Sequence, residues 1–354
     1  MFFHHAEFRI NVGLAKLAIV LCCFAGCVRT TGSPQVVVYA ALDREFSEPI
    51  LKDFEKETGI RVRTKFDTES TKTVGLTQQI ITESKARTRC DLFWNNEILN
   101  TLRLDELGLL ETTQPTQAKS FPSEFRSSEN RWFGFAARAR VLIVNTNVVS
   151  AEEMPDSIYS LLDPKWKGKV AMAKPLFGTT ASHAVCLFET LGEVKAKEFF
   201  DGLKNNEVQI LSGNKQVAED VASGRVAFGL TDTDDAIIEI ESGFPVRIVY
   251  PDSKPGELGT LFIPNTISVM RNSPNPEAAQ RLADYLLSAE VEQRLASGKS
   301  AQIPLHADGK EVVGSTASRI QRPSDVKAME VDFARVVQRW GAVSVYLKKQ
   351  FAGN

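Results

Sequence analysis

The feature that most constrains the fold of this chain is a regular alternation of strand-like and helix-like segments. Residues 36–42 form a short apolar run rich in β-branched side chains, and apolar residues then recur at helical spacing until Gly59 supplies a helix stop. Residues 60–66 alternate as a second strand, and residues 73–84 have the pattern of a helix. This order is typical of a parallel sheet with right-handed crossovers. We therefore predict an α/β protein.

The same alternation continues into the C-terminal region. Further strands are predicted at residues 90–94, 140–144, 169–173, 226–230, 261–263 and 266–270. Further helices are predicted at residues 98–107, 181–191, 195–203, 215–223, 276–287 and 289–296, and helical spacing recurs in residues 326–351. The 354 residues suffice for two domains, since a domain typically has roughly 100–200 residues.

The N-terminal segment has the pattern of an export signal. An apolar run at residues 17–26 is long enough for the hydrophobic region of a signal peptide and too short to span a bilayer. The run leads into Cys27 in a sequence that resembles a bacterial lipobox. We expect residues 1–26 to be removed and Cys27 to carry a lipid anchor; a signal without lipidation, cleaved nearby, is the alternative. The mature domain is then expected in the periplasm or cell envelope.

Composition and motifs argue against several function classes. A net charge of −2 at pH 7 is unlike that of a general nucleic-acid binder, which normally has a basic excess. No GxSxG, HExxH, P-loop or GxGxxG motif stands at a matching strand–helix junction. Asp234 and Asp235 resemble the paired carboxylates of a hydrolase, but consecutive residues rarely hold two carboxyl groups across a substrate. We therefore expect a protein that is not an enzyme.

Polar side chains follow several of the predicted strands. In open α/β sheets, ligands bind beyond the carboxyl ends of strands, where helices begin. The polar residues and glycine at such places are Asp43, Asn96, Glu97, Gly178, Thr179, Thr180, Asn214, Asp232, Asp234 and Asp235. Many of these residue types are also ordinary helix caps, so each position taken alone has a structural explanation. Their origin in separate strands favours a shared binding cleft.

The chemistry of this set favours a hard cation or an amine, because carboxylate and amide oxygens dominate it. His183 and His306 are the only histidines beyond the export signal, so a histidine-based zinc site is not expected. Asp43, Asp234 and Asp235 would repel one another in a closing cleft, and burial would further disfavour their charged forms. We therefore expect at least one of them to have a raised pKa.

Several motifs, in order along the chain, carry a family resemblance. They include Cys-Asp-Leu-Phe-Trp at residues 90–94, Asp-Pro-Lys-Trp-Lys-Gly-Lys-Val at 163–170, Val-Ala-Ser-Gly-Arg-Val-Ala-Phe-Gly-Leu at 221–230 and Pro-Asn-Pro-Glu-Ala-Ala at 274–279. On an exported chain of this length, the set resembles the bacterial extracellular solute-binding proteins of ABC importers, and most closely their ferric-iron-binding branch. The resemblance implies the two-lobed type II periplasmic-binding-protein fold, in which a ligand is trapped between the lobes and delivered to a membrane permease.

The resemblance also implies lobe boundaries. The N-terminal lobe would be discontinuous, with residues 34–138 plus 263–354, and the C-terminal lobe would contain residues 139–262. The helical segment at the C-terminus is then expected to pack on the first lobe. Arg138 and Arg140 flank the proposed hinge, and we expect one to face the cleft and the other to face solvent. A monomer is expected.

In the ferric-iron-binding branch, the metal ligands are typically a histidine, a carboxylate and two adjacent tyrosines, with a bound anion. Carried across position by position, Asp43 takes the histidine place and Asn96, with Glu97 beside it, takes the carboxylate place. Asp234 and Asp235 take the places of the tyrosine pair. All of these differ from the family pattern. The resemblance therefore implies either an iron site built from carboxylates or a cleft whose cargo has changed.

The anion-binding positions match better, because Gly178, Thr179, Thr180 and Asn214 lie where helix N-termini would offer backbone N–H groups to carbonate or phosphate, with Asp232 nearby. The leading prediction is a substrate-binding lipoprotein of an ABC importer for ferric iron or a related cation. One alternative keeps the fold and changes the cargo to a small organic ion, such as an aminophosphonate, a polyamine or a thiamine-like cation. Another is a purely structural envelope lipoprotein without ligand-dependent closure.

Overall fold

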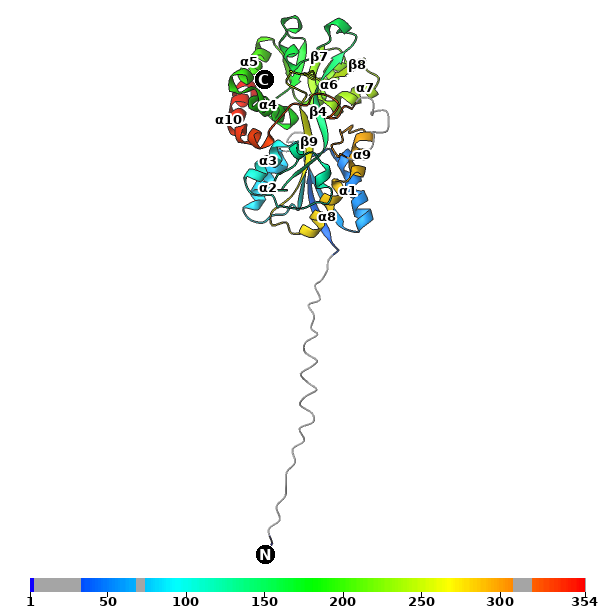
Figure 1. The fold of residues 1–354 in the computed structure, drawn as a ribbon, viewed down its shortest axis with the longest axis vertical. Helices are drawn as coiled ribbons and strands as arrows, with labels where there is room; N and C mark the ends of the chain where they lie inside the picture. Colours follow the sequence, from blue (N-terminus) through cyan, green and yellow to red (C-terminus); the bar gives the residue numbers. More distant parts are fainter. Residues whose placement is uncertain (3–32, 68–73, 308–319, 354) are drawn as a thin grey trace.

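The computed structural model describes residues 1–2, 33–67, 74–307 and 320–353. Almost all of the predicted signal peptide, and Cys27, lie outside the described residues, so the lipid anchor stays a prediction. The described chain forms two α/β lobes, one above the other, with β4 and β9 (residues 133–145 and 262–269) passing between them (Figure 1).

The strands alternate with helices along the chain, as predicted. They are β1 (Gln35–Ala40), β2 (Arg61–Phe66), β3 (Leu92–Asn95), β4 (Phe133–Asn145), β5 (Val170–Ala173), β6 (Gln209–Leu211), β7 (Phe228–Asp232), β8 (Val246–Val249) and β9 (Phe262–Val269). Their order is β2-β1-β3-β9-β4-β7-β5-β6, with β8 beside β4. β1 pairs in parallel with β2 and β3, whereas β9 is antiparallel to both β3 and β4. The α/β prediction is confirmed.

Helices surround the sheet in both lobes. The α-helices are α1 (Arg44–Thr58), α2 (Val74–Ser84), α3 (Leu99–Glu106), α4 (Gly178–Leu191), α5 (Glu193–Asn205), α6 (Asn214–Ala222), α7 (Thr233–Glu241), α8 (Pro276–Leu286), α9 (Ala289–Ser297) and α10 (Phe333–Phe351). Short 3-10 helices are η1 (Ala118–Ser120), η2 (Ser123–Phe125), η3 (Ala151–Glu153), η4 (Ile158–Leu162) and η5 (Pro164–Trp166). Among the described helices, none is both long and apolar enough to cross a membrane.

The strand β4 joins the two lobes. Its first part pairs with β9, up to Ala139 opposite Phe262, and its second part pairs with β7, from Arg140 opposite Asp232. One buried strand therefore changes partners within a single residue step. Side chains near this step lie between the lobes, where a ligand can contact both.

A β-bulge in β4 accommodates Pro264, which the sequence analysis placed between two separate strands. β9 instead continues through Pro264, and the pairing register of β4 shifts between Phe135 and Arg138. Proline has no N–H to donate. In the bulge, Ala136 has a φ of 43°, and its N–H donates to Glu292 Oε1 at 2.6 Å. Bulges redirect the side chains that follow them, and here the next side chain in register is Arg138.

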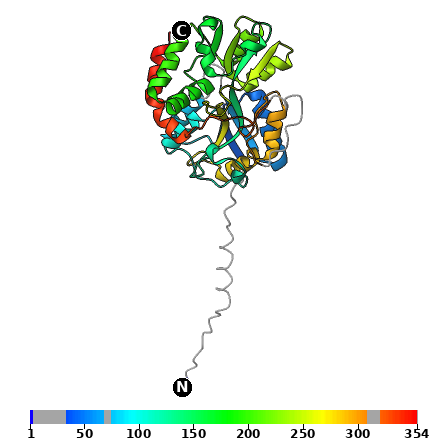
Figure 2. The same ribbon diagram turned by 45° about the horizontal axis from the view of Figure 1, so that its top comes forward.

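The C-terminal segment differs from the prediction in two ways. Residues 326–332 are not helical, and α10 begins only after Asp332, whose carboxylate caps its first turn. The helix was expected on the first lobe but packs mainly on α4 of the second (Figures 1 and 2). Arg335 Nε, for example, lies 2.9 Å from Glu189 Oε1 of α4. Helical periodicity predicts an apolar face but not the surface that covers it.

Candidate functional site

A cavity of about 130 Å³ lies between the lobes, beside the step at which β4 changes partners. Its walls come from strand ends and helix starts of both lobes. The lining residues are Asp43, Asn96, Arg138, Ala173, Lys174, Phe177, Gly178, Thr179, Thr180, Ser212, Gly213, Asn214, Lys215, Asp232, Asp234 and Asp235. The structure therefore brings together all the predicted ligand-site residues except Glu97.

The carboxylates gather at the start of α7. β7 ends with Asp232, and α7 carries Asp234 and Asp235 in its first turn, where the helix dipole favours negative charge. One oxygen from each of these three carboxylates lies within 4.8 Å of the others. Asp43, at the N-cap of α1, and Asn96 line the same cavity from the first lobe. The cluster has the oxygen ligands that a hard cation needs.

Asp232 is fully engaged by the second lobe. Its Oδ1 accepts a hydrogen bond from Arg140 Nη1 at 2.5 Å, and its Oδ2 accepts from Thr179 Oγ1 at 2.6 Å and Asn214 Nδ2 at 2.9 Å. Thr180 Oγ1 donates to Asn214 Oδ1 at 3.0 Å and extends the network. Asp232 therefore ties β7 to α4, α6 and the hinge strand, and its oxygens are already in use.

Asp234 has a different environment. Its Oδ1 is buried and has no hydrogen-bond partner in the part of the chain that the structure describes. Its Oδ2 lies 3.4 Å from both Arg138 Nη2 and Gln302 Nε2. Burial raises the pKa of Asp234, and the charges of Asp232 and Asp43 act in the same direction, while Arg138 opposes them. The prediction of a raised pKa within this acidic group is confirmed.

Arg138 and Arg140 both point away from solvent, so the expectation that one of them is exposed was wrong. Arg140 is fully buried against Asp232, and Arg138 is 6% exposed at the carboxylate end of the cavity. Burial disfavours the charge of Arg138, but the surrounding aspartates outweigh it and raise the pKa of this guanidinium. Arg138 therefore stays charged beside the cluster.

Another wall of the cavity is formed by the N-termini of α4 and α6, next to Asp232. α4 begins at Gly178, which has a φ of 62°, and α6 begins at Asn214 after Gly213. Nothing lies within 4 Å of the place where a Cβ would stand on either glycine. Lys174 and Lys215 line the same wall. Because helix N-termini present free N–H groups and a positive dipole end, this wall suits an anion.

Glu97 is the predicted site residue that does not line the cavity. Its carboxylate accepts hydrogen bonds from the backbone N–H groups of Leu99 at 2.6 Å and Asn100 at 3.0 Å, so it caps the start of α3. It also accepts a hydrogen bond from Ser182 Oγ of α4 at 2.8 Å. Glu97 is therefore a helix cap and a link between the lobes. Its place beside Asn96 in the sequence gave no signal of the Ser182 contact.

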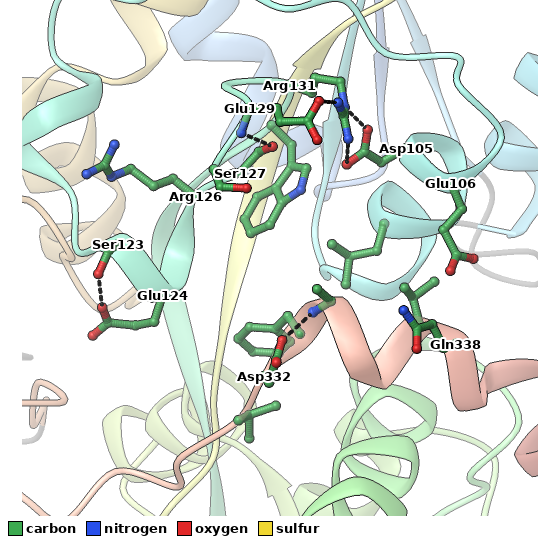
Figure 3. Close-up of a pocket in the computed structure, with 17 residues that line it drawn as sticks. Asp105, Glu106, Ser123, Glu124, Arg126, Ser127, Glu129, Arg131, Asp332 and Gln338 are labelled. Atoms are coloured by element: carbon green, nitrogen blue, oxygen red, sulfur yellow. Dashed lines mark hydrogen bonds and ion pairs between the residues drawn. The ribbon is translucent and has the colours of Figure 1, made fainter.

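A larger cavity, of about 490 Å³, lies between α3 and the start of α10 (Figure 3). Some of its charged side chains pair with one another. Arg131 contacts both Asp105 and Glu129, and Asp332 caps α10. Because the predicted ligand-site residues and the cluster of three carboxylates line the smaller cavity between the lobes, we place the candidate site there.

Comparisons with known proteins agree with this architecture. A family model described as bacterial extracellular solute-binding protein matches residues 100–328. The protein named iron uptake protein A1, from Synechocystis sp., is 26% identical over 315 residues, which cover 85% of this chain and 84% of that protein.

Two solved structures share the fold. One is a Trichodesmium protein in complex with iron and citrate ligands, with a TM-score of 0.76 and 22% identity, covering 90% of this chain and 100% of that one. The other is a periplasmic binding protein from Actinobacillus pleuropneumoniae with fructose-6-phosphate bound, with a TM-score of 0.77 and 20% identity, covering 91% and 99%. The type II two-lobed fold is thus confirmed, and this chain belongs to the family of bacterial extracellular solute-binding proteins.

Proposed function

We propose that this protein is the substrate-binding component of an ABC importer and captures ferric iron, together with an anion, for delivery to a membrane permease. The observation that carries the proposal is the presence, in one interlobe cavity, of a carboxylate cluster and two helix N-termini. The cluster suits a hard cation and the helix N-termini suit an anion. The name of the Synechocystis relative, iron uptake protein A1, supports this choice of cargo.

The residues of the cavity fit iron through oxygen ligands. Asp43, Asp234 and Asp235 would supply carboxylates, and Asn96 would supply an amide oxygen. The residues that line the described cavity include no tyrosine and no histidine. A carbonate or phosphate at the N-termini of α4 and α6 would add further oxygen ligands and offset part of the charge of the metal.

Native mass spectrometry with elemental analysis tests the cargo. Protein purified from its own cell envelope should carry one ferric ion per chain, with an anion. A stoichiometric organic ion in place of the metal would contradict the iron proposal. If no added candidate ligand bound or closed the lobes, the protein would belong to the structural envelope class.

A second candidate is a small organic molecule that carries an anionic group, such as an aminophosphonate. The observation that favours it is the charge of the cavity, where Arg138, Lys174 and Lys215 line the walls together with the aspartates. Those cations fit a phosphonate or phosphate better than they fit a polyamine or a thiamine-like cation. The same mass-spectrometry experiment separates this candidate from iron.

We further propose that the protein is exported, held in the periplasm or cell envelope by a lipid on Cys27, and active as a monomer beside a permease of the cytoplasmic membrane. The export pattern and the extracellular family support this location. A Cys27→Ser variant should be released from membranes and keep its ligand binding. Unchanged retention in a detergent-partitioning experiment would argue against lipidation.

A further inference from the structure

One oxygen of Asp234 is held by Gln302, which is not among the described residues that line the cavity. The Gln302 side chain is buried, with the residue 1% exposed, and its Nε2 donates to Asp234 Oδ2 at 3.4 Å. Arg138 contacts the same oxygen, whereas Oδ1 has no hydrogen-bond partner in the described part of the chain. Both contacts therefore fall on one oxygen of the carboxylate, and the other oxygen remains available to a ligand.

The contact between Gln302 and Asp234 joins the two lobes. Gln302 follows α9, and its backbone N–H donates to Leu295 O of that helix at 3.1 Å. α9 lies beside α1 in the first lobe, where Arg294 Nη2 is 2.8 Å from Asp53 Oδ2 (Figure 1). Asp234 belongs to α7 of the second lobe. An amide of one lobe thus reaches a carboxylate of the other, so the contact depends on how the lobes are placed.

The neighbours of Gln302 fix which end of its amide faces Asp234. Its Oε1 accepts a hydrogen bond from Asn265 Nδ2 at 2.7 Å, and its Nε2 also donates to the Ser300 carbonyl oxygen at 3.1 Å. A reversed amide would place Oε1 against a carbonyl oxygen and an ionised carboxylate, neither of which can donate. Gln302 therefore presents an N–H to Asp234.

Gln302 is also fixed to both hinge strands. Asn265, in β9, uses the same Nδ2 to donate to the carbonyl oxygen of Ala136 in the β4 bulge. The next residue, Ile303, pairs with β4 through Ala137, to which its N–H donates at 2.6 Å. A buried side chain with these partners has little rotational freedom, so it can fix the orientation of the carboxylate that it contacts.

We propose that Gln302 is a positioning residue for the cargo, in that it holds Asp234 through Oδ2 and keeps Oδ1 available as a ligand of the metal. This inference rests on the proposed function and adds a residue that acts through Asp234. Partners that orient a metal-binding side chain typically change metal affinity about 10–100-fold when they are lost. Because the donor comes from the first lobe, Asp234 is fully oriented only when the lobes take this arrangement.

Terbium(III) luminescence tests this role, because its lifetimes in ordinary and heavy water report how many waters the bound ion carries. Gln302→Met keeps the length of the side chain and removes the N–H donor. Terbium bound to this variant should carry about one more water than in the wild type, as in Asp234→Ala, because water replaces a lost oxygen ligand. The affinities for terbium and for ferric citrate, measured by calorimetry, should each fall roughly tenfold.

The double variant Gln302→Met, Asp234→Ala separates positioning from a structural role. If Gln302 acts through Asp234, the double variant should match Asp234→Ala in terbium hydration and terbium affinity. Gln209→Met is the matched control, because the Gln209 amide also donates to a backbone carbonyl, that of Gly168 at 2.9 Å, and is not among the described residues of the cavity lining. It should leave both quantities unchanged.

Unchanged terbium hydration in folded Gln302→Met would overturn the inference. An equal loss of terbium affinity on adding Gln302→Met to the wild type and to Asp234→Ala would also overturn it. If Gln302→Met does not fold, Gln302→Asn decides by the same two criteria, because it keeps the amide and withdraws it from Asp234.

The outcomes also separate this inference from the proposed function. If the wild-type protein binds terbium but not ferric citrate, the iron proposal fails, and the terbium comparison still tests Gln302. If it binds neither, the carboxylate cluster is not a cation site, and both the proposed function and this inference fail.

Discussion

Asp232 and Asp234 stand two residues apart at the start of α7, yet their surroundings differ. Both oxygens of Asp232 are hydrogen-bonded, to Arg140 on one side and to Thr179 and Asn214 on the other. Asp234 has one oxygen without a partner in the described structure, and its other oxygen has only contacts of 3.4 Å. The two residues are of the same type and nearly at the same position. The number of hydrogen-bonded carboxylate oxygens therefore distinguishes the structural carboxylate of Asp232 from the ligand-binding carboxylate of Asp234.

The comparison has an energetic consequence. A buried carboxylate with all its partners contributes to the folded state through them, and removing one partner leaves the other charge buried and uncompensated. A buried carboxylate with few partners contributes little to folding, because its desolvation is poorly offset. Substitutions of Asp232 should therefore affect stability, and substitutions of Asp234 should affect binding.

The largest effect is expected for Asp232→Ala. The substitution leaves the Arg140 guanidinium fully buried without its carboxylate, and the free energy of unfolding should fall by roughly 3–5 kcal/mol, as is typical of a broken buried ion pair. Urea unfolding of the ligand-free protein measures it. The double variant Arg140→Met, Asp232→Leu removes both charges and should recover much of the loss. A loss below about 1 kcal/mol in Asp232→Ala would show that the network is not a scaffold.

The next effect concerns binding. Asp234→Asn combined with Asp235→Asn keeps size and hydrogen-bonding capacity, removes two charges and should lower the affinity for ferric citrate at least a hundredfold, about 2.7 kcal/mol. The free energy of unfolding should fall less than in Asp232→Ala, because Asp234 is poorly compensated in the native state and Arg138 keeps the nearby charges of Asp232 and Asp43. Calorimetry and urea unfolding measure the two quantities. Wild-type affinity in the double variant would mean that these aspartates only favour the start of α7.

Much of the cavity was predictable because of a general property of open α/β sheets. Strands end and helices begin at the same edge, so the positions of Asp43, Asn96, Thr180 and Asn214 could be inferred from the local pattern alone. The role of Glu97 could not, because its partner Ser182 is 85 residues away and belongs to the other lobe.

The burial of Arg138 and Arg140 could not be predicted from the sequence either. The direction of Arg138 depends on the bulge at Ala136, which compensates for Pro264 in the neighbouring strand. The pattern of residues 140–144 predicts only a short strand. It does not reveal that β4 also has an N-terminal part that contains a bulge. Contacts across strands and lobes therefore decide which polar residues are scaffold and which face the ligand.

A smaller effect concerns the pH dependence of stability. It tests how closed the surroundings of the buried Arg140–Asp232 pair are. Burial lowers the pKa of His183 well below its usual range, and the nearby charge of Arg140 acts in the same direction. The unfolded chain therefore binds this proton more readily than the folded one. The stabilising contribution is complete above the ordinary histidine pKa of about 6.5 and is lost as pH falls below it, by at most about 1.4 kcal/mol per pH unit.

Urea unfolding of the wild type and of His183→Gln, at about pH 7.5 and about pH 5.5, isolates this contribution. The two pH values lie on either side of the ordinary histidine pKa. The wild type should lose more stability than the variant on acidification. Parallel losses in both proteins would mean that His183 is readily protonated in the native state, and that the surroundings of Arg140 are less closed than the structure indicates.

The smallest expected effect comes from Ser182→Ala. It extends the comparison of Asp232 and Asp234 to a third buried carboxylate, that of Glu97. Glu97 is saturated like Asp232, but one of its donors, Ser182, comes from the other lobe. Without that donor the carboxylate still accepts the N–H groups of Leu99 and Asn100. The loss, about 1 kcal/mol, should therefore fall on the closed arrangement alone and lower the closed-to-open ratio roughly fivefold.

Small-angle scattering measures this effect as a radius of gyration. Adding ferric citrate should lower the radius of the wild type, because a ligand that contacts both lobes binds the closed state better. Ligand-free Ser182→Ala should have a larger radius than the ligand-free wild type, and the ligand should bring the two together. Ser344→Ala, at a half-buried position on α10 whose hydroxyl bonds within its own helix, is the control. If Ser182→Ala matched this control in every condition, the Glu97 carboxylate would be only a helix cap, and closure would depend on the ligand and the hinge.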